Sequence, residues 1–230
     1  MSSAWASLEI PKNLTEVDRT KATEILGLSS ATKLLGNPYP LGGFSGVEIG
    51  YSTEIISTSE LSRLGGKAPS QGETSYQVLS VGKGLYNNID VFVQFIPETQ
   101  EEAIWGYGGQ LRWGFLQAEY LPAYLTLVIS ANSTSFQNKV SVVAQSTDLV
   151  VGFNVEDVTL YTGLGVVRAI GTFVGGAANG ITDTGNTAQA DVSEPHYLAG
   201  VNLKVSKAFL AMEIDRYTKA TYSAKLGIRF

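Results

Sequence analysis

Few residues in this chain of 230 could carry out chemistry on a substrate. The chain has no cysteine and a single histidine, His196. Without cysteine there is no thiol nucleophile, no disulfide framework and no cysteine-ligated zinc or iron–sulfur site. One histidine also excludes a multi-histidine metal site. We therefore expect neither a metal nor a cofactor.

His196 is the natural candidate for a catalytic base. It follows Ser193, Glu194 and Pro195 at the expected outer end of a strand. A serine hydrolase needs the histidine within hydrogen-bond reach of the serine, with a third group that orients the ring. Neighbouring strand positions point to opposite faces, so this run does not assemble such a site. We expect a histidine in a surface loop and a non-enzymatic protein; a lipid hydrolase that uses His196 is the alternative.

Two other stretches suggest ligand binding but lack the required spacing. Asp183 and Asn186 lie in a run without the full spacing and closing glutamate of a calcium loop. Residues 175–180 read Gly-Gly-Ala-Ala-Asn-Gly, and no Lys-Ser or Lys-Thr follows, as a phosphate loop requires. We expect both stretches to belong to a long, mobile surface loop.

The elements that must position these residues are strands. From Phe44 onward apolar residues alternate with polar or small ones, as in Val47, Ile49 and Tyr51, and this period of two recurs along nearly the whole chain. The predicted strands are 44–56, 74–84, 88–96, 103–117, 121–132, 138–154, 157–169, 196–206, 208–216 and 221–230. Alternation slips between Val142 and Val151. A bulge within 138–154 explains the slip, and two separate strands, giving about twelve in all, are the alternative.

The residue types on the two faces of the strands indicate whether water or lipid surrounds the sheet. Only 16% of residues are charged, against about 25% in a typical soluble domain. The polar faces are rich in Gly and Ser, whereas the apolar faces carry Trp and Tyr near the expected strand ends. Long strands with this composition predict an all-β, transmembrane antiparallel β-barrel with aromatic girdles. The net charge of −5 argues against nucleic acid as the main partner.

The chain ends in a ladder of alternating apolar residues, Tyr222, Leu226, Ile228 and Phe230. This ladder resembles the C-terminal targeting signal of Gram-negative outer-membrane β-barrel proteins, and the barrel pattern covers roughly residues 44–230. The resemblance implies an integral outer-membrane protein surrounded by lipid or detergent. It also implies that the barrel-assembly machinery binds the C-terminal strand, and that Phe230 lies at the periplasmic edge.

An even strand number then places both termini on the periplasmic side. The short connections become periplasmic turns, and residues 57–73 and 170–195 become extracellular loops. Recognition of a surface, phage or host could reside in these loops.

Residues 1–41 differ from the barrel of residues 42–230. Thr15 and Asp18 resemble a capping box, and Val17, Ile25 and Leu28 fall roughly on one helical face. A second short helical piece follows, and the prolines near residue 40 then break the chain. This short N-terminal helical segment is either a cap on the barrel or a plug inside it.

Strand alternation assigns residues to the lumen and to the lipid face. The charged and polar residues expected to line the lumen are Glu48, Glu54, Asp90, Gln94, Arg112, Lys204, Glu213, Asp215, Lys225 and Arg229. The residues expected in the lipid-facing girdles are Tyr51, Trp105, Tyr107, Trp113, Tyr197, Tyr222 and Phe230. The lumen charges either neutralise one another in salt bridges or line a polar path for solutes.

The strand number limits the function. Eight strands enclose a lumen that side chains just fill, and open water channels need about sixteen. About ten strands predict a narrow, gated channel for small solutes or ions. The alternatives are a structural or adhesive barrel that acts through its loops, and uptake of hydrophobic molecules through a lateral opening.

Overall fold

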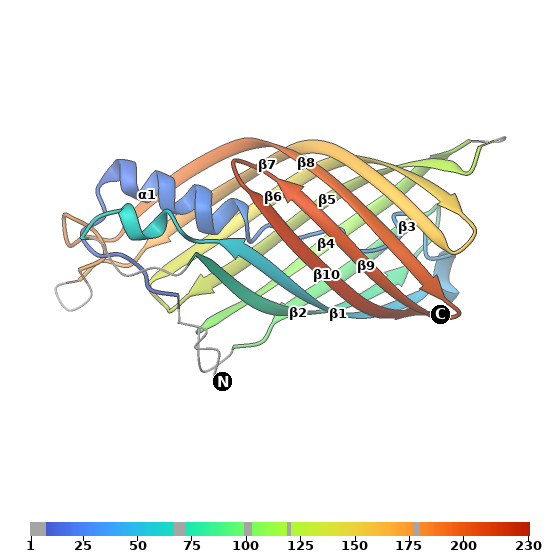
Figure 1. The fold of residues 1–230 in the computed structure, drawn as a ribbon, viewed down its shortest axis with the longest axis horizontal. Coiled ribbons are helices and arrows are strands. Elements are labelled where there is room, and N and C mark those ends of the chain that lie inside the picture. The colour runs from blue at the N-terminus through green and yellow to red at the C-terminus, as the bar shows by residue number, and fades with distance from the viewer. Residues whose placement is uncertain (1–7, 67–71, 99–102, 119–120, 177–179) are drawn as a thin grey trace.

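The computed structural model describes residues 8–66, 72–98, 103–118, 121–176 and 180–230. Ten antiparallel strands in the described residues form one closed barrel, in which each strand pairs with its sequence neighbours and β1 pairs with β10 (Figure 1). The strands are β1 (Val47–Ser57), β2 (Glu73–Gly84), β3 (Ile89–Ile96), β4 (Ile104–Gln117), β5 (Ala123–Phe136), β6 (Val140–Val155), β7 (Val158–Phe173), β8 (Ala188–Val205), β9 (Ala208–Arg216) and β10 (Ala220–Arg229). The predicted fold class is confirmed.

The predicted bulge in residues 138–154 is wrong. β6 pairs with β5 and β7 in continuous register, and the irregularity lies instead in β4, between Gly114 and Leu116. The alternation slips in β6 because the lumen changes in character along the strand. Val142 faces an apolar lumen, whereas Asp148 faces a polar one, although both point inward. One strand therefore crosses both regions, and the twelve-strand alternative is excluded.

The two ends of the barrel differ. Short connections (85–88, 118–122, 156–157 and 206–207) and Phe230 lie at one end, which we call the turn end. The longer connections 58–72 and 174–187 lie at the opposite end, the loop end. β7 and β8 extend further than predicted, so the second loop is shorter than the expected 170–195. Residues 67–71 and 177–179 of these loops lie outside the described residues.

The two described ends of the chain lie at opposite ends of the barrel. Phe230 bonds the backbone of Val47 at the turn end. The carbonyl of Leu8 accepts a bond from Gln137, in the β5–β6 connection at the loop end. The expectation that both termini lie on one side fails for these residues, because the chain passes through the lumen before β1 begins. Residues 1–7 lie outside the described residues.

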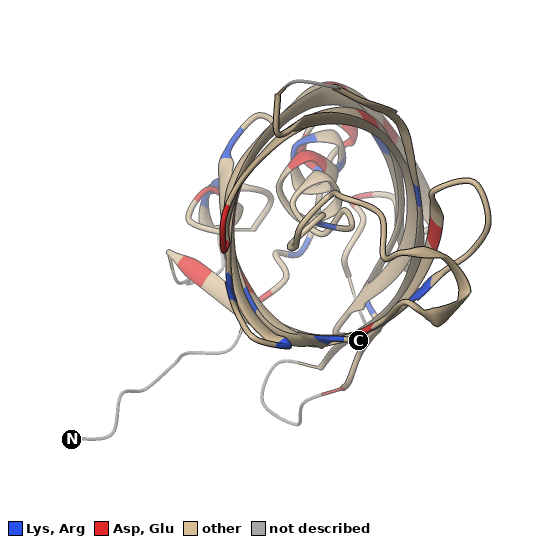
Figure 2. Ribbon diagram, turned by 90° about the vertical axis from the view of Figure 1, so that its right-hand side faces the viewer, with Lys and Arg blue, Asp and Glu red and all other residues tan. Residues whose placement is uncertain are grey.

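The segment before β1 begins with a short helix. In α1 (Glu16–Ala22) the Thr15 side chain accepts a bond from the Asp18 amide, and the Asp18 side chain bonds the Thr15 amide, so the capping box is present. A π-helical stretch, Thr23–Leu28, continues α1, and two 3-10 turns lie at Gly43–Ser45 and Leu61–Arg63. Seen along the barrel axis, the helix lies inside the ring of strands (Figure 2). No helix among the described residues is long and apolar enough to span a membrane.

Candidate functional site in the barrel lumen

Residues 8–41, which we call the lumen segment, begin at the loop end, where Val17 is exposed, and run through the interior of the barrel. Between the loop end and mid-barrel, residues 8–28 pack against inward apolar side chains of the wall. Leu14, Ile25, Leu26 and Leu28 of the segment belong to one buried cluster with Phe136, Val142, Ala169 and Phe173 of β5, β6 and β7. This part of the lumen, the apolar zone, is a hydrophobic core enclosed by a sheet.

Hydrogen bonds join the lumen segment to the loop end. The Asn13 and Leu14 amides donate to the carbonyls of Gly180 and Ile181 at 2.7 and 2.8 Å. The Arg19 guanidinium donates to Asp183 and to the Leu14 carbonyl, each at 2.8 Å. Asp183, considered above as a residue of a loop resembling a calcium site, is therefore an ion-pair partner of α1.

From residue 29 to residue 41 the segment is irregular, and the wall satisfies its backbone. Both carboxylate oxygens of Glu213 accept bonds, at 2.9 Å each, from the amides of Leu34 and Leu35. Arg112 donates to the Leu34 carbonyl, and Asp90 accepts from the Leu41 amide. We call this part of the lumen the polar zone. In it, charged side chains of the wall form hydrogen bonds with a main chain that belongs to neither a sheet nor a helix.

Buried ion pairs complete the polar zone near the turn end. Glu48 bonds Lys225 at 2.8 Å and Arg229 at 3.1 Å. Arg229 also donates to the Asn37 carbonyl at 3.0 Å, so the pairs contact the segment directly. Arg112 lies 3.9 Å over the Phe92 ring. Charges buried this deeply are tolerated because each has a partner of opposite sign or several hydrogen bonds.

Lys33 is the charged group that the lumen segment itself brings into the polar zone. Its ammonium donates to the carbonyls of Ser29 and Ala31 and to the Tyr217 hydroxyl, and it lies 3.9 Å from Glu54. Glu54 also accepts a 2.7 Å bond from Tyr76. The segment thus contributes a cation to a wall that offers a carboxylate.

His196 is not in a surface loop, contrary to expectation. It lies within β8, 2% exposed, and faces the lumen. Its ring bonds Asp148 at 2.6 Å and Asp215 at 2.9 Å and stacks on Tyr217 at 4.5 Å. A ring that bonds two carboxylates carries hydrogen on both nitrogens unless one carboxyl is itself protonated. The prediction failed because β8 begins at Ala188, so His196 is a mid-strand residue.

The bonds of His196 leave no room for the hydrolase arrangement considered above. Both ring nitrogens are occupied by carboxylates, and the exposed Ser193 lies on the opposite face of β8. A serine does enter the network indirectly: Ser146 donates to Asp148 at 2.8 Å and is bonded to Ser130 at 2.9 Å. With an aspartate between serine and histidine, His196 cannot take a proton from either serine directly.

The structure places the predicted lumen residues as follows. Seven are buried and face the lumen: Glu48, Glu54, Asp90, Arg112, Glu213, Asp215 and Lys225. Two are half-buried, Gln94 and Arg229. Lys204 is exposed at the turn end. Sequence reasoning missed Lys33, Asp148 and His196. Asp148 has the inward parity of Val142 and could have been found by extending the alternation of β6 without a bulge.

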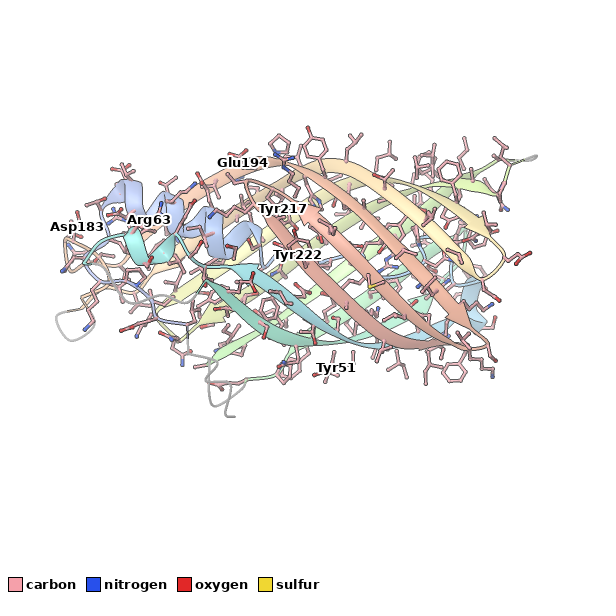
Figure 3. All side chains as sticks on the ribbon, in the orientation of Figure 1. Tyr51, Arg63, Asp183, Glu194, Tyr217 and Tyr222 are labelled. Carbon is pink, nitrogen blue, oxygen red and sulfur yellow. The ribbon has the colours of Figure 1, made fainter. Side chains whose placement is uncertain are left out.

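The residues predicted for the lipid face all project outward and are exposed. Tyr51, Trp105, Tyr107, Trp113, Tyr197, Tyr222 and Phe230 have exposed fractions between 37% and 61%, and Leu226 and Ile228 are exposed beside them. Side chains cover the outer wall densely (Figure 3). A closed antiparallel barrel with an apolar exterior, whose two longest connections lie at the same end, is the architecture of Gram-negative outer-membrane barrels.

The solved structures that resemble this chain share little sequence with it. No family model and no curated protein matches the chain. Solved structures that resemble it include the N-terminal β-barrel domain of Pseudomonas aeruginosa OprF (TM-score 0.40, 14% identity, covering 82% of this chain and 98% of that one). Ail of Yersinia pestis matches with a TM-score of 0.34 and 13% identity, covering 80% of this chain and 97% of that one. A loop-deleted OmpT, an outer membrane protein of Vibrio cholerae, matches with a TM-score of 0.34 and 11% identity, covering 96% of this chain and 74% of that one.

Proposed function

We propose that this barrel is an outer-membrane channel for small polar solutes or ions, held closed by its own lumen segment. The observation that supports it most directly is the polar zone. There an irregular chain occupies a path lined by charged side chains of both signs, including Glu213, Arg112 and Asp90. Rings of charged side chains are a common way to build a selective pore.

The width of the path supports the proposal. A ten-stranded barrel is only slightly wider than the eight-stranded kind that side chains fill. Here the lumen accommodates a helix in the apolar zone and a single irregular chain in the polar zone (Figure 2). If residues 8–41 leave the lumen, the apolar and polar zones open together, and the resulting passage is narrow enough to suit small hydrated solutes.

A reversible tether tests whether the segment is the gate. The chain has no cysteine, so a designed pair is unambiguous. A Cβ built on Gly108 of β4 lies 3.2 Å from the Thr32 hydroxyl oxygen of the lumen segment. A disulfide requires about 3 Å between the Cβ of one cysteine and the sulfur of the other. Thr32→Cys with Gly108→Cys therefore reaches disulfide distance if β4 and β5 separate slightly at this pair, because the new Cβ lies 2.8 Å from the Asn132 Cβ and 3.1 Å from the Ala131 carbonyl oxygen.

The readout is single-channel recording in planar bilayers. We expect the unmodified protein to open intermittently, the oxidised pair to stay closed, and reduction to restore opening. The matched control is Ser130→Cys with Ser146→Cys, neighbours on β5 and β6 whose hydroxyl oxygens are 2.9 Å apart. That disulfide lies within the wall, and its oxidised and reduced forms both lack the Ser146 bond to Asp148, so oxidation and reduction of this pair should leave gating unchanged. Opening that persists in the oxidised Thr32–Gly108 pair contradicts the proposal.

A second candidate function is a permanently closed barrel that acts through its loops. The apolar zone favours it, because side chains such as Leu26, Phe136 and Phe173 are fully buried there and would contact water if the whole segment left. The recordings separate the two: a permanently closed barrel gives no openings in the unmodified protein at any voltage.

The orientation and assembly of the barrel complete the proposal. The turn end faces the periplasm, and Tyr222, Leu226, Ile228 and Phe230 form the signal bound by the barrel-assembly machinery. Support comes from the closure of the barrel at this point, where Phe230 and Val47 exchange backbone bonds of 2.8 and 3.1 Å. Phe230→Ala should lower the amount of folded protein in the membrane without changing the conductance of the molecules that fold.

A further inference from the structure

The outer surface of the barrel has an apolar hollow on the face formed by β8, β9, β10 and β1. Its volume is about 750 Å³, and small residues such as Thr53, Ala199 and Ala224 line it between Ile55, Ile214 and Tyr222. All six side chains have the outward parity of their strands. The hollow therefore opens toward the hydrocarbon of a surrounding bilayer rather than toward the lumen.

The hollow ends at a boundary between apolar and polar exterior. Along β8 the outward residues below this boundary are Leu203, Val201 and Ala199, and those above it are Ser193, Asp191 and Gln189. Tyr197 lies between the two groups, and its direct cross-strand partner is Arg216 of β9. The change from apolar to polar side chains marks the level of the lipid head groups, where aromatic and basic residues are enriched.

Arg216 is the charge at the upper end of the hollow. It is exposed, and among the described residues it has no ion pair or hydrogen bond through its guanidinium. A second hollow of about 420 Å³ begins beside it and continues the first along β8 and β9; it is lined by Glu194, Pro195, Tyr197, Arg216 and Tyr217, so one carboxylate shares it with the guanidinium. Another exposed arginine of the outer wall, Arg168, is by contrast already paired with Asp191.

We propose that this face binds one lipid of the membrane that has an anionic head group. Its acyl chain lies in the hollow over Ala199 and Ala224, and its head group pairs with Arg216. Three features define this occupant: an apolar trough at hydrocarbon depth, a free cation at head-group depth, and a tyrosine between them. The proposal depends on insertion in a membrane and not on gating, so it can fail while the channel proposal stands.

Site-directed fluorescence quenching tests the proposal. Ala224→Cys places a bimane label in the hollow, and the protein is reconstituted in vesicles of phosphatidylcholine. Doxyl-labelled phosphatidylglycerol is the anionic probe, and doxyl-labelled phosphatidylcholine is the zwitterionic one. One basic residue near a membrane surface contributes about 1 kcal/mol toward an anionic lipid, so we expect about fivefold preferential quenching by the anionic probe.

Two variants make the result decisive. In Arg216→Gln the preference should fall to about one. The matched control is Ala131→Cys, in another outward hollow, of about 570 Å³, lined by Leu111, Ile129 and Thr147 and lacking a basic residue. Equal quenching by both probes at Ala131 and anionic preference at Ala224 support the site. Equal preference at both positions, no preference at Ala224, or a preference that survives Arg216→Gln overturns it.

Discussion

The two zones of the lumen close the barrel by different physical means. In the apolar zone, residues 8–28 and the wall around Phe136 and Phe173 form a packed hydrophobic core. In the polar zone, backbone amides of residues 29–41 donate hydrogen bonds to Glu213, and their carbonyls accept from Arg112. Burial of apolar area is nondirectional and stabilises wherever packing is dense, whereas each charge-assisted bond depends on one partner. The first zone therefore contributes most to stability, and because the two zones lie in series along the lumen, both must release the segment for the barrel to open.

The largest expected effect comes from the network where the zones meet. His196→Ala removes the shared partner of Asp148 and Asp215 and leaves two buried carboxylates uncompensated. Breaking a buried ion pair in this way costs about 3–5 kcal/mol. Urea unfolding of the detergent-folded protein should show that loss, and Ser193→Ala, on the exposed face of the same strand, should show none. A His196→Ala protein of unchanged stability would mean that the network contributes nothing.

A core truncation should test the apolar zone alone. Leu26→Ala empties a fully buried site, and such changes cost about 2–5 kcal/mol. Val17→Ala on α1 is the control, because Val17 is 79% exposed and should change the free energy of unfolding by no more than about 0.5 kcal/mol. Similar losses for both variants would show that burial of Leu26 in the apolar zone does not stabilise the barrel.

A single-atom change should affect the polar zone selectively. Glu213→Gln replaces one acceptor oxygen by a donor, so it cannot accept from both Leu34 and Leu35. Loss of a hydrogen bond to a charged group costs about 1.5–3 kcal/mol, which predicts at least a tenfold rise in open probability. Lys204→Gln, at the exposed rim, should alter ion selectivity without altering opening. Unchanged open probability in Glu213→Gln would contradict this role.

The smallest effect concerns the contact of α1 with the loop end. Glu60 lies 2.8 Å from Lys219 and 3.9 Å from Lys21 of α1. The hydrogen bond from Lys219 holds the pKa of Glu60 below its ordinary value of 4.5. A lowered folded-state pKa means that this contribution is present above about pH 4.5 and is lost as the pH falls below it. For an exposed pair it is at most about 1 kcal/mol.

Unfolding curves between pH 6 and pH 3 measure that contribution. The unmodified protein should lose slightly more stability over this range than Glu60→Gln, which has no carboxyl to protonate. A Glu60→Gln protein with the same or a steeper pH dependence would show that the ion pairs of Glu60, chiefly the one with Lys219, are not stabilising.

The strands were predictable because lipid on one side and a lumen on the other impose a period of two. The alternation misled the prediction where the surroundings of one strand face changed between apolar and polar along the strand. In β6 the inward residues change from Val142 and Ala144 to Ser146 and Asp148, which resembled a bulge in the sequence. In β8 the residues before His196 have a polar outward face, since they lie beyond the apolar exterior, so the start of the strand was placed too late.

The candidate site was predictable only in part. Parity alone placed Glu213, Arg112 and Lys225 toward the lumen. The backbone groups that they bind belong to an irregular segment with no period, and contacts such as Leu34 with Glu213 join residues 179 positions apart. No local rule identifies such a pair, and the same holds for Lys33 and Tyr217.

The most direct test of the central claim follows one molecule of the oxidised Thr32→Cys, Gly108→Cys protein in a planar bilayer while a reductant is added. A gate formed by the lumen segment predicts a silent trace that begins to show openings after the disulfide is reduced. Openings of equal frequency before and after reduction would show that ions cross the barrel without movement of the segment, and would contradict the account.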